Sequence, residues 1–187
     1  MLGSLISSRT RIRLLSLFLL NPGREYYIRE IERITGENIN AVRRELANLA
    51  EFGIIRGERK GNQQYYTVNP DHFLYTDLQR IFLKTEGAPG MIRDALSGEP
   101  VTCMFVYGSF AKGTSGEKSD IDLFLIGDIS EDRLIPVVHD CEERLGREIN
   151  YTLMTEEEFS RRKVSGDPFV TNIMREEKIF LIGTCDD

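Results

Sequence analysis

The stretch GSFAKGTSGEKSDIDLFLIG, residues 108–127, sets two aspartates one residue apart at the start of an apolar run, directly after a loop rich in glycine, serine and lysine. The apolar runs 121–126 and 101–106 predict two strands on either side of this loop. Alternate residues of a strand share a face, so Asp120 and Asp122 should lie side by side, about 6.6 Å apart. At an effective dielectric near 20 their charges repel by roughly 2.5 kcal/mol. A compensating positive charge is therefore expected.

Two kinds of compensation fit the paired aspartates. Lys112 or Lys118 could form a salt bridge at a solvated strand end, which is the commoner outcome for an isolated Asp-x-Asp. The context favours a divalent cation, because a Gly-Ser corner ends the first strand and a glycine-rich loop follows. Backbone N–H groups and the Ser109 hydroxyl could hold a triphosphate there, while the two carboxylates hold Mg²⁺, a cation that prefers oxygen ligands. Such an ion would orient an attacking oxygen toward the α-phosphate.

The segment from Gly108 to Asp122 resembles the signature of the DNA polymerase beta-like nucleotidyltransferase superfamily, and looks most like its minimal archaeal and bacterial domains. The shared positions, in the family's order, are Gly108-Ser109, Ala111, Gly113 and Ser119-Asp120-Ile121-Asp122. The resemblance implies a small α/β fold with a mixed sheet over residues 88–187, completed by a strand near Ile179. It also implies a nucleoside triphosphate as substrate or ligand, with Mg²⁺ or Mn²⁺ as cofactor. Asp120 and Asp122 would be the catalytic metal ligands, and Gly108, Ser109, Lys112 and Ser119 would contact the nucleotide.

The third acidic position of the family departs from the pattern. After a helix predicted over residues 131–145, the strand REINYTLM places Asn150 where a carboxylate is expected. Asparagine cannot take up a proton and is a poorer Mg²⁺ ligand. Glu148 has the same strand parity and could substitute only by a displacement of about one strand repeat. General-base assistance is typically worth 10²- to 10⁴-fold, so a domain without it could bind nucleotide yet transfer slowly or not at all.

The first 70 residues have a different pattern. Three helices are predicted, each bounded by turn or cap signals: 9–20, a segment from 26 to 36 that begins extended, and 38–53. Two strands follow, 54–56 and 64–68, joined by a loop that carries Arg59 and Lys60 between Gly57 and Gly61. Three helices and a basic hairpin resemble the winged helix-turn-helix of many prokaryotic transcriptional regulators.

That second resemblance implies double-stranded DNA as a partner. The helix that starts after Asn38 would enter the major groove, and the hairpin would lie on the backbone or in the minor groove. Asn40, Arg43 and Arg44 lie off the apolar stripe of this helix, and together with Arg59 and Lys60 they are the predicted DNA contacts, with Arg56 a further cation. The alternative is that the arginines only solvate a helix face and that the module pairs with protein.

The predicted organisation is α+β, with a winged helix-turn-helix over 1–70, a connecting helix and linker over 71–87, and the nucleotidyltransferase-fold domain over 88–187. The apolar connecting helix is expected from Asp71 to Lys84, with the boundary at 85–90, and it could support a homodimer. Net charge is +4 for residues 1–70 and −10 for residues 71–187. A basic half and an acidic half favour two domains with different partners.

Composition excludes several other classes. The longest apolar run, 14–20, is too short to span a bilayer, so no membrane partner is expected. Three distant cysteines without a Cys-x-x-Cys pair argue against a disulfide framework or a zinc site and favour a reducing cytoplasm.

The favoured function is a DNA-binding regulator whose second domain binds Mg-NTP and could transfer a nucleoside monophosphate. The alternative is an active nucleotidyltransferase targeted by its winged helix. The family resemblance alone also implies an antitoxin-like partner that modifies or neutralises a toxin. The acceptor, the preferred base, the DNA site and the oligomeric state are not specified by the sequence.

Overall fold

The computed structural model describes residues 2–116 and 118–185, with only the backbone at positions 144 and 145. The chain divides into two compact units between Thr85 and Glu86. No helix in these described ranges is long and apolar enough to cross a membrane.

The N-terminal unit combines helices with a small antiparallel sheet. Its elements in chain order are η1 (Leu2–Ser4), α1 (Arg9–Leu19), β1 (Tyr26–Tyr27), α2 (Ile28–Thr35), α3 (Ile39–Phe52), β2 (Ile55–Lys60), β3 (Gln63–Val68) and α4 (Tyr75–Thr85). The strand order is β1-β3-β2, so the short strand between α1 and α2 pairs with the hairpin. Leu14, Phe18, Ile31, Val42 and Leu46 are fully buried and form the centre of its core.

The predicted helix signals of this unit are confirmed. The Asn38 side chain accepts a hydrogen bond from the Asn40 N–H at 2.9 Å and caps α3. Gly36 and Gly53 end α2 and α3 with φ of 65° and 88°, a conformation that glycine adopts at little cost. Glu45, also on α3, is buried and accepts hydrogen bonds from Ser8 and Arg11 on the α1 side, which the sequence pattern did not indicate.

Two boundaries in the sequence analysis are wrong. The hairpin has no loop at Arg59 and Lys60, because β2 continues through both and pairs in register up to Lys60 with Gln63. The α4 helix begins at Tyr75 instead of Asp71, since Asn69 holds the preceding residues in a turn through its side-chain and backbone oxygens. Residues 88–90, at the end of the expected boundary region 85–90, form the first turn of the next helix, and the division between Thr85 and Glu86 lies at the start of that region.

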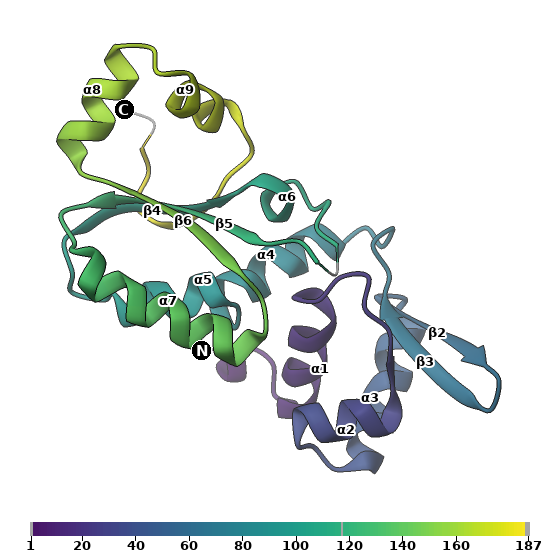
Figure 1. Cartoon of the computed structure of the whole chain (residues 1–187). Helices are drawn as coiled ribbons and strands as arrows, with labels where there is room; N and C mark the ends of the chain where they lie inside the picture. Colours follow the sequence, from purple (N-terminus) through teal and green to yellow (C-terminus); the bar gives the residue numbers. More distant parts are fainter. Residues whose placement is uncertain (1, 117, 186–187) are drawn as a thin grey trace. The chain divides into compact units, whose positions relative to one another are not determined.

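The C-terminal unit is a mixed four-stranded sheet covered by helices. Its elements are α5 (Ala88–Ala95), β4 (Val101–Tyr107), α6 (Gly108–Ala111), β5 (Ile121–Gly127), α7 (Glu131–Leu145), β6 (Ile149–Met154), α8 (Glu156–Val164), α9 (Pro168–Arg175) and β7 (Ile179–Ile182). The strand order is β6-β5-β4-β7, with β5 and β6 parallel and the other neighbours antiparallel. The predicted mixed sheet is therefore confirmed. In Figure 1, α5 and α7 lie on one face of this sheet and α8 and α9 on the other.

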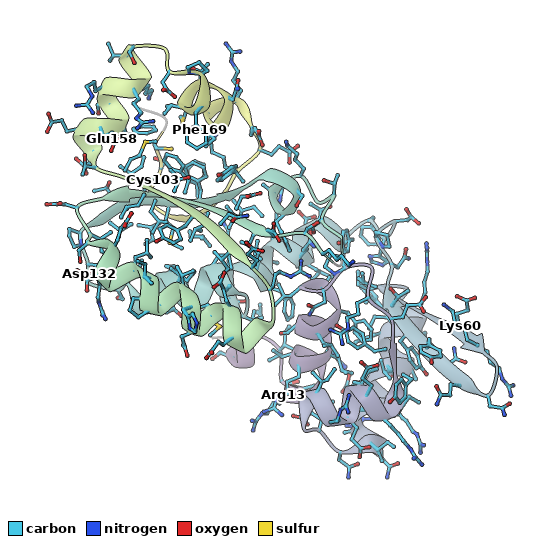
Figure 2. All side chains as sticks on the ribbon, in the orientation of Figure 1. Arg13, Lys60, Cys103, Asp132, Glu158 and Phe169 are labelled. Atoms are coloured by element: carbon cyan, nitrogen blue, oxygen red, sulfur yellow. The ribbon has the colours of Figure 1, made fainter. Side chains whose placement is uncertain are left out.

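The side of the sheet that faces α8 and α9 carries an aromatic core. Phe105 and Phe124 stack with ring centroids 5.1 Å apart, and Phe159 of α8 meets Phe124 edge-on. Figure 2 shows Cys103 in this same layer, where it is buried with Val170 and Ile173 of α9. Because alternate residues share a face, Asp122 lies on the side of β5 that also carries Phe124.

Candidate functional site

A row of three polar side chains crosses the sheet next to the Gly108 corner. Tyr107 at the end of β4 pairs with Asp122 on β5, and Asp122 pairs with Asn150 on the parallel strand β6. Asp120 lies just before β5, and its Oδ2 accepts a hydrogen bond from Asn150 Nδ2 at 3.4 Å. Asn150, which stands where the sequence resemblance led us to expect a third carboxylate, thus lies beside both Asp120 and Asp122. Glu148 precedes β6, and its backbone oxygen accepts from the Ile121 N–H at 3.0 Å.

The turn at Gly108 has room for no side chain. Gly108 has a φ of +69°, and a Cβ added there would lie 2.4 Å from Oδ2 of Asp122. Ser109 follows in the first turn of α6, and its backbone oxygen accepts from the Thr114 N–H at 3.0 Å. The corner therefore brings backbone directly beside a carboxylate, which is how glycine serves sites where a ligand must approach the main chain.

Negative charge accumulates at this corner. Burial raises the pKa of the Asp122 carboxyl, and the charges of Asp120 and Glu176 raise it further. Burial also raises the pKa of the Tyr107 phenol, with Asp122 and Glu176 adding to the shift and a hydrogen bond with Thr152 opposing it. Glu176, which ends α9, is thus a third carboxylate near the paired aspartates, and no motif in the sequence pointed to it.

The two lysines considered as counter-charges have separate positions. Lys112 caps α6, and its Nζ lies 2.9 Å from Oε2 of Glu176, so its ion pair goes to the third carboxylate. Lys118 is exposed in the loop before Asp120.

Arg147 holds the loop that leads to Asp120. Its guanidinium donates to the backbone oxygens of Gly116 and Ser119 and lies over the Phe110 ring of α6, 5.2 Å from the centroid. The Ser119 hydroxyl oxygen in turn accepts from the Gly116 N–H at 2.8 Å. Ser119, predicted to contact nucleotide, therefore also closes its own loop. Arg147 could not be identified from spacing alone, since its partners are distant in sequence.

The carboxylates of Asp120 and Asp122 suit a hard divalent cation whose coordination shell is completed by ligands from outside the protein. Within the described residues, no group of three or more histidine, cysteine, aspartate and glutamate side chains is placed to hold a metal. Mg²⁺ commonly takes only one or two protein carboxylates and completes its shell with phosphate and water oxygens. Asp120 and Asp122 supply such a pair. Burial, followed by the charges of Asp120 and Glu176, raises the pKa of Asp122, and a bound cation would stabilise its ionised form.

In the N-terminal unit, the predicted nucleic-acid contacts on α3 are accessible. Asn40, Arg43 and Arg44 are exposed on the face away from the core. Burial raises the pKa of the Tyr66 phenol on β3, and the nearby charge of Arg43 opposes this shift. Arg59 on β2 pairs with Gln64 on β3, and Gln64 and Tyr66 are alternate residues of that strand. Arg59 and Tyr66 therefore lie on the same face of the hairpin. Arg43, Tyr66 and Arg59 consequently lie along the same side.

The remaining cations of the hairpin already have acidic neighbours. Lys60, labelled on the hairpin in Figure 2, lies 2.6 Å from Oε2 of Glu25, and this hydrogen bond raises the pKa of its amine. Arg56 Nη2 lies 2.9 Å from Oδ2 of Asp71. Strand alternation puts Lys60 on the face opposite Arg59.

Comparison with known proteins found similarity for the C-terminal unit. Among curated proteins, no sequence match was found. Solved structures with partial similarity include a mutant of the MntA-HpeT toxin-antitoxin (14% identity, TM-score 0.36) and a toxin-antitoxin with AMP-PNP (19% identity, TM-score 0.35). Each alignment covers 51% of this chain and 73% of the other chain. Residues 91–181, which run from α5 to β7, match the model of the nucleotidyltransferase domain family, and the C-terminal unit is therefore a nucleotidyltransferase-like domain.

Proposed function

We propose that this chain is a DNA-binding regulator whose C-terminal unit binds a nucleoside triphosphate together with Mg²⁺ or Mn²⁺. One observation carries the nucleotide part. The side-chain-free turn at Gly108 lies directly against Asp122, so the backbone that would receive phosphates and the carboxylate that would receive the cation are adjacent. The family match over residues 91–181 supports the same proposal.

Each part of this site has a proposed role. Asp120 and Asp122 would hold the cation, which, when bound, offsets the charge of the phosphates and polarises the α-phosphate. Gly108, Ser109 and Lys112 would contact the phosphates, and Ser119 would keep the loop before Asp120 in place. Nucleotidyl transfer also requires a group that accepts the proton of the incoming hydroxyl. The Asn150 amide cannot do this, so we propose that nucleotide binding is retained and that transfer is slow.

The direct test is labelling. Purified protein is incubated with each of the four labelled nucleoside triphosphates, Mg²⁺ or Mn²⁺, and cell extract. Equilibrium dialysis measures binding, and gel autoradiography measures transfer to an acceptor. We expect metal-dependent binding that is lost on addition of EDTA, with at most weak transfer. Absence of binding to all four nucleotides with either metal would refute the proposal, whereas strong transfer would favour an active enzyme with its N-terminal unit as a targeting module.

Replacing Asn150 with aspartate should raise the rate of transfer. The new carboxylate would stand next to Asp122 in register and could accept a proton, although repulsion from Asp120 and Asp122 limits the gain. We expect a rise of about 10- to 100-fold in the single-turnover rate, toward the low side of general-base contributions. Asn172→Asp, which adds the same charge on the exposed side of α9, is the control. An unchanged rate with intact nucleotide binding would show that the missing carboxylate does not limit transfer.

For the N-terminal unit, we propose that α3 enters the major groove of double-stranded DNA. Support comes from the arrangement of three helices and a paired hairpin, and from the shared side of Arg43, Tyr66 and Arg59. The basic charge of residues 1–70 agrees with a polyanionic partner.

The double substitution Arg43→Ala, Arg44→Ala should lower the affinity for DNA and make the binding less sensitive to salt concentration. If both arginines neutralise phosphates, the slope of log K against log salt falls by about 1.8, because each phosphate contact contributes about 0.9. Fluorescence anisotropy with promoter fragments at several salt concentrations measures both quantities. Arg133→Ala with Arg161→Ala removes two exposed cations from the C-terminal unit and should leave the slope unchanged. Equal slopes for all three proteins would rule out α3 as the DNA-contacting helix.

A further inference from the structure

Glu176 is placed at the edge of the nucleotide corner by the end of α9. It caps that helix just before β7, whose residue Ile179 pairs with Val106 near the end of β4. Its Oε2 lies 2.9 Å from Nζ of Lys112, the residue that ends α6. One ion pair thus links the α9–β7 connection to the short helix that begins at Gly108.

The charge balance makes this ion pair a competitor of phosphate. The charges of Asp120 and Glu176 both act on the Asp122 carboxyl, so Glu176 adds negative charge near the proposed cation site. A triphosphate brings several more negative charges to the same place. Lys112 is the cation that the phosphates would need, and in this structure Glu176 holds it. The Glu176 carboxylate and the triphosphate would therefore compete for the ammonium group of Lys112.

The exchange requires only side-chain rotation, because the backbone around Glu176 is fixed. The Glu176 N–H donates to the Ile173 oxygen at 3.1 Å, and its own oxygen accepts from Lys178 Nζ at 3.0 Å. The Lys178 ammonium also donates to the Met174 oxygen. The side chains of Lys112 and Glu176 are 46% and 33% exposed. Exposed side chains change rotamer within picoseconds to nanoseconds, so breaking the pair needs no rearrangement of α9 or β7.

We propose that Glu176 is an internal competitor of the triphosphate, holding Lys112 when nucleotide is absent and releasing it to the phosphates when nucleotide binds. This inference rests on the proposed nucleotide site and adds to it a residue that sets its affinity. The triphosphate must therefore displace the Glu176 carboxylate from Lys112 before its phosphates can pair with that ammonium group.

A double-mutant cycle tests the competition. The dissociation constant of a fluorescent ATP analogue with Mg²⁺ is measured for the wild type, Glu176→Gln, Lys112→Met and the double variant. Glu176→Gln should lower the Kd about three- to fivefold, the upper part of the range expected when a partly exposed ion pair no longer opposes binding. Lys112→Met should raise the Kd. In the Lys112→Met background, Glu176→Gln should change the Kd less than about twofold, because the two residues act as one unit.

Two controls separate competition from general charge effects and from misfolding. Glu177→Gln removes the same charge from the exposed neighbouring residue and should change the Kd less than about twofold. Glu176→Ala repeats the removal with a different side chain, and circular dichroism checks that each variant is folded.

The outcomes distinguish this inference from the proposed function. If the wild type binds nucleotide and Glu176→Gln binds equally or more weakly, the competition is disproved while the site stands. The same holds if Glu177→Gln gives an equal gain, or if the gain persists without Lys112. If neither the wild type nor Glu176→Gln binds nucleotide, both proposals fail together.

Discussion

Replacing Gly108 with alanine is expected to abolish measurable nucleotide binding and to lower the free energy of unfolding by about 2–4 kcal/mol. Two costs add at this position. The φ of +69° is unfavourable for any residue with a Cβ, and the new methyl carbon would lie 2.4 Å from Oδ2 of Asp122. Relief of that clash must move either the turn or the carboxylate, and both are parts of the proposed site. Chemical denaturation and equilibrium dialysis with labelled nucleotide measure the two effects.

Gly166 provides a matched control for this substitution. It has the same φ of +69°, yet a Cβ there would meet no atom within 4 Å. Gly166→Ala therefore carries the backbone cost alone, of order 1 kcal/mol, and should leave nucleotide binding unchanged. The difference in unfolding free energy between the two variants isolates the contact with Asp122. Equal destabilisation by both variants, with binding intact in each, would contradict the close approach of Gly108 to that carboxylate.

The second large effect is expected for Asp122→Asn, which should cost function while stabilising the protein. Under the proposed function, loss of one of the two carboxylates would weaken the hold on the cation that polarises the α-phosphate, so the transfer rate should fall by roughly 10³-fold. Metal-dependent nucleotide binding should weaken as well. The melting temperature without metal should rise, because burial and the charges of Asp120 and Glu176 oppose the ionised form of Asp122.

The raised pKa of Asp122 determines how the stability difference between Asp122→Asn and the wild type changes with pH. A group whose pKa is higher in the folded than in the unfolded state favours folding fully below its unfolded pKa, about 3.9 for aspartate, and this contribution is lost as the pH rises through the folded pKa. The stability advantage of Asp122→Asn over wild type should therefore appear above that window and vanish in acid. Thermal melts of both proteins across this range provide the measurement. Asp128→Asn, at an exposed position just after β5, is the control and should leave both the transfer rate and the melting temperature close to those of the wild type. A lower melting temperature for Asp122→Asn at neutral pH would contradict the charge argument.

The elements nearest the Gly108 turn could be predicted because their signals are local. The Gly-Ser corner, the paired aspartates and the following apolar strand lie within one stretch of chain, and Asn150 could be placed by counting along the next strand. Strand pairing then puts Asn150 beside Asp122. The nucleotidyltransferase-like fold of the C-terminal unit follows from the same segment.

Glu176 and Arg147 were missed for a common reason. Each reaches the site from a distant segment, and each acts through tertiary contacts: Glu176 with Lys112, and Arg147 with backbone oxygens of the loop before Asp120. A glutamate at a helix end and an arginine before a strand are ordinary solvated positions by pattern. Only the packing of α9 and β6 against the corner gives them partners.

At two of the predicted boundaries, glycine and proline lie within regular secondary structure. Gly57 and Gly61 were interpreted as the ends of a loop, but Gly57 lies within β2, where a Cβ would be 2.8 Å from Nε2 of Gln64. There glycine permits close side-chain packing on a strand and does not mark a turn. Pro89 lies in the region 85–90 that was interpreted as the domain boundary, but it belongs to the first turn of α5, where the missing N–H of proline costs nothing.

The register between β5 and β6 has a consequence for how this domain could change over time. Asp122 and Asn150 are fixed opposite each other by the ladder of backbone hydrogen bonds, so exchanging an amide for an acid at position 150 alters the chemistry without altering the architecture. Under the proposed function, one isosteric replacement at position 150 would change transfer separately from nucleotide binding. On that proposal, a lineage carrying this scaffold could gain or lose transfer at position 150 while the pairing of β5 with β6 stays the same.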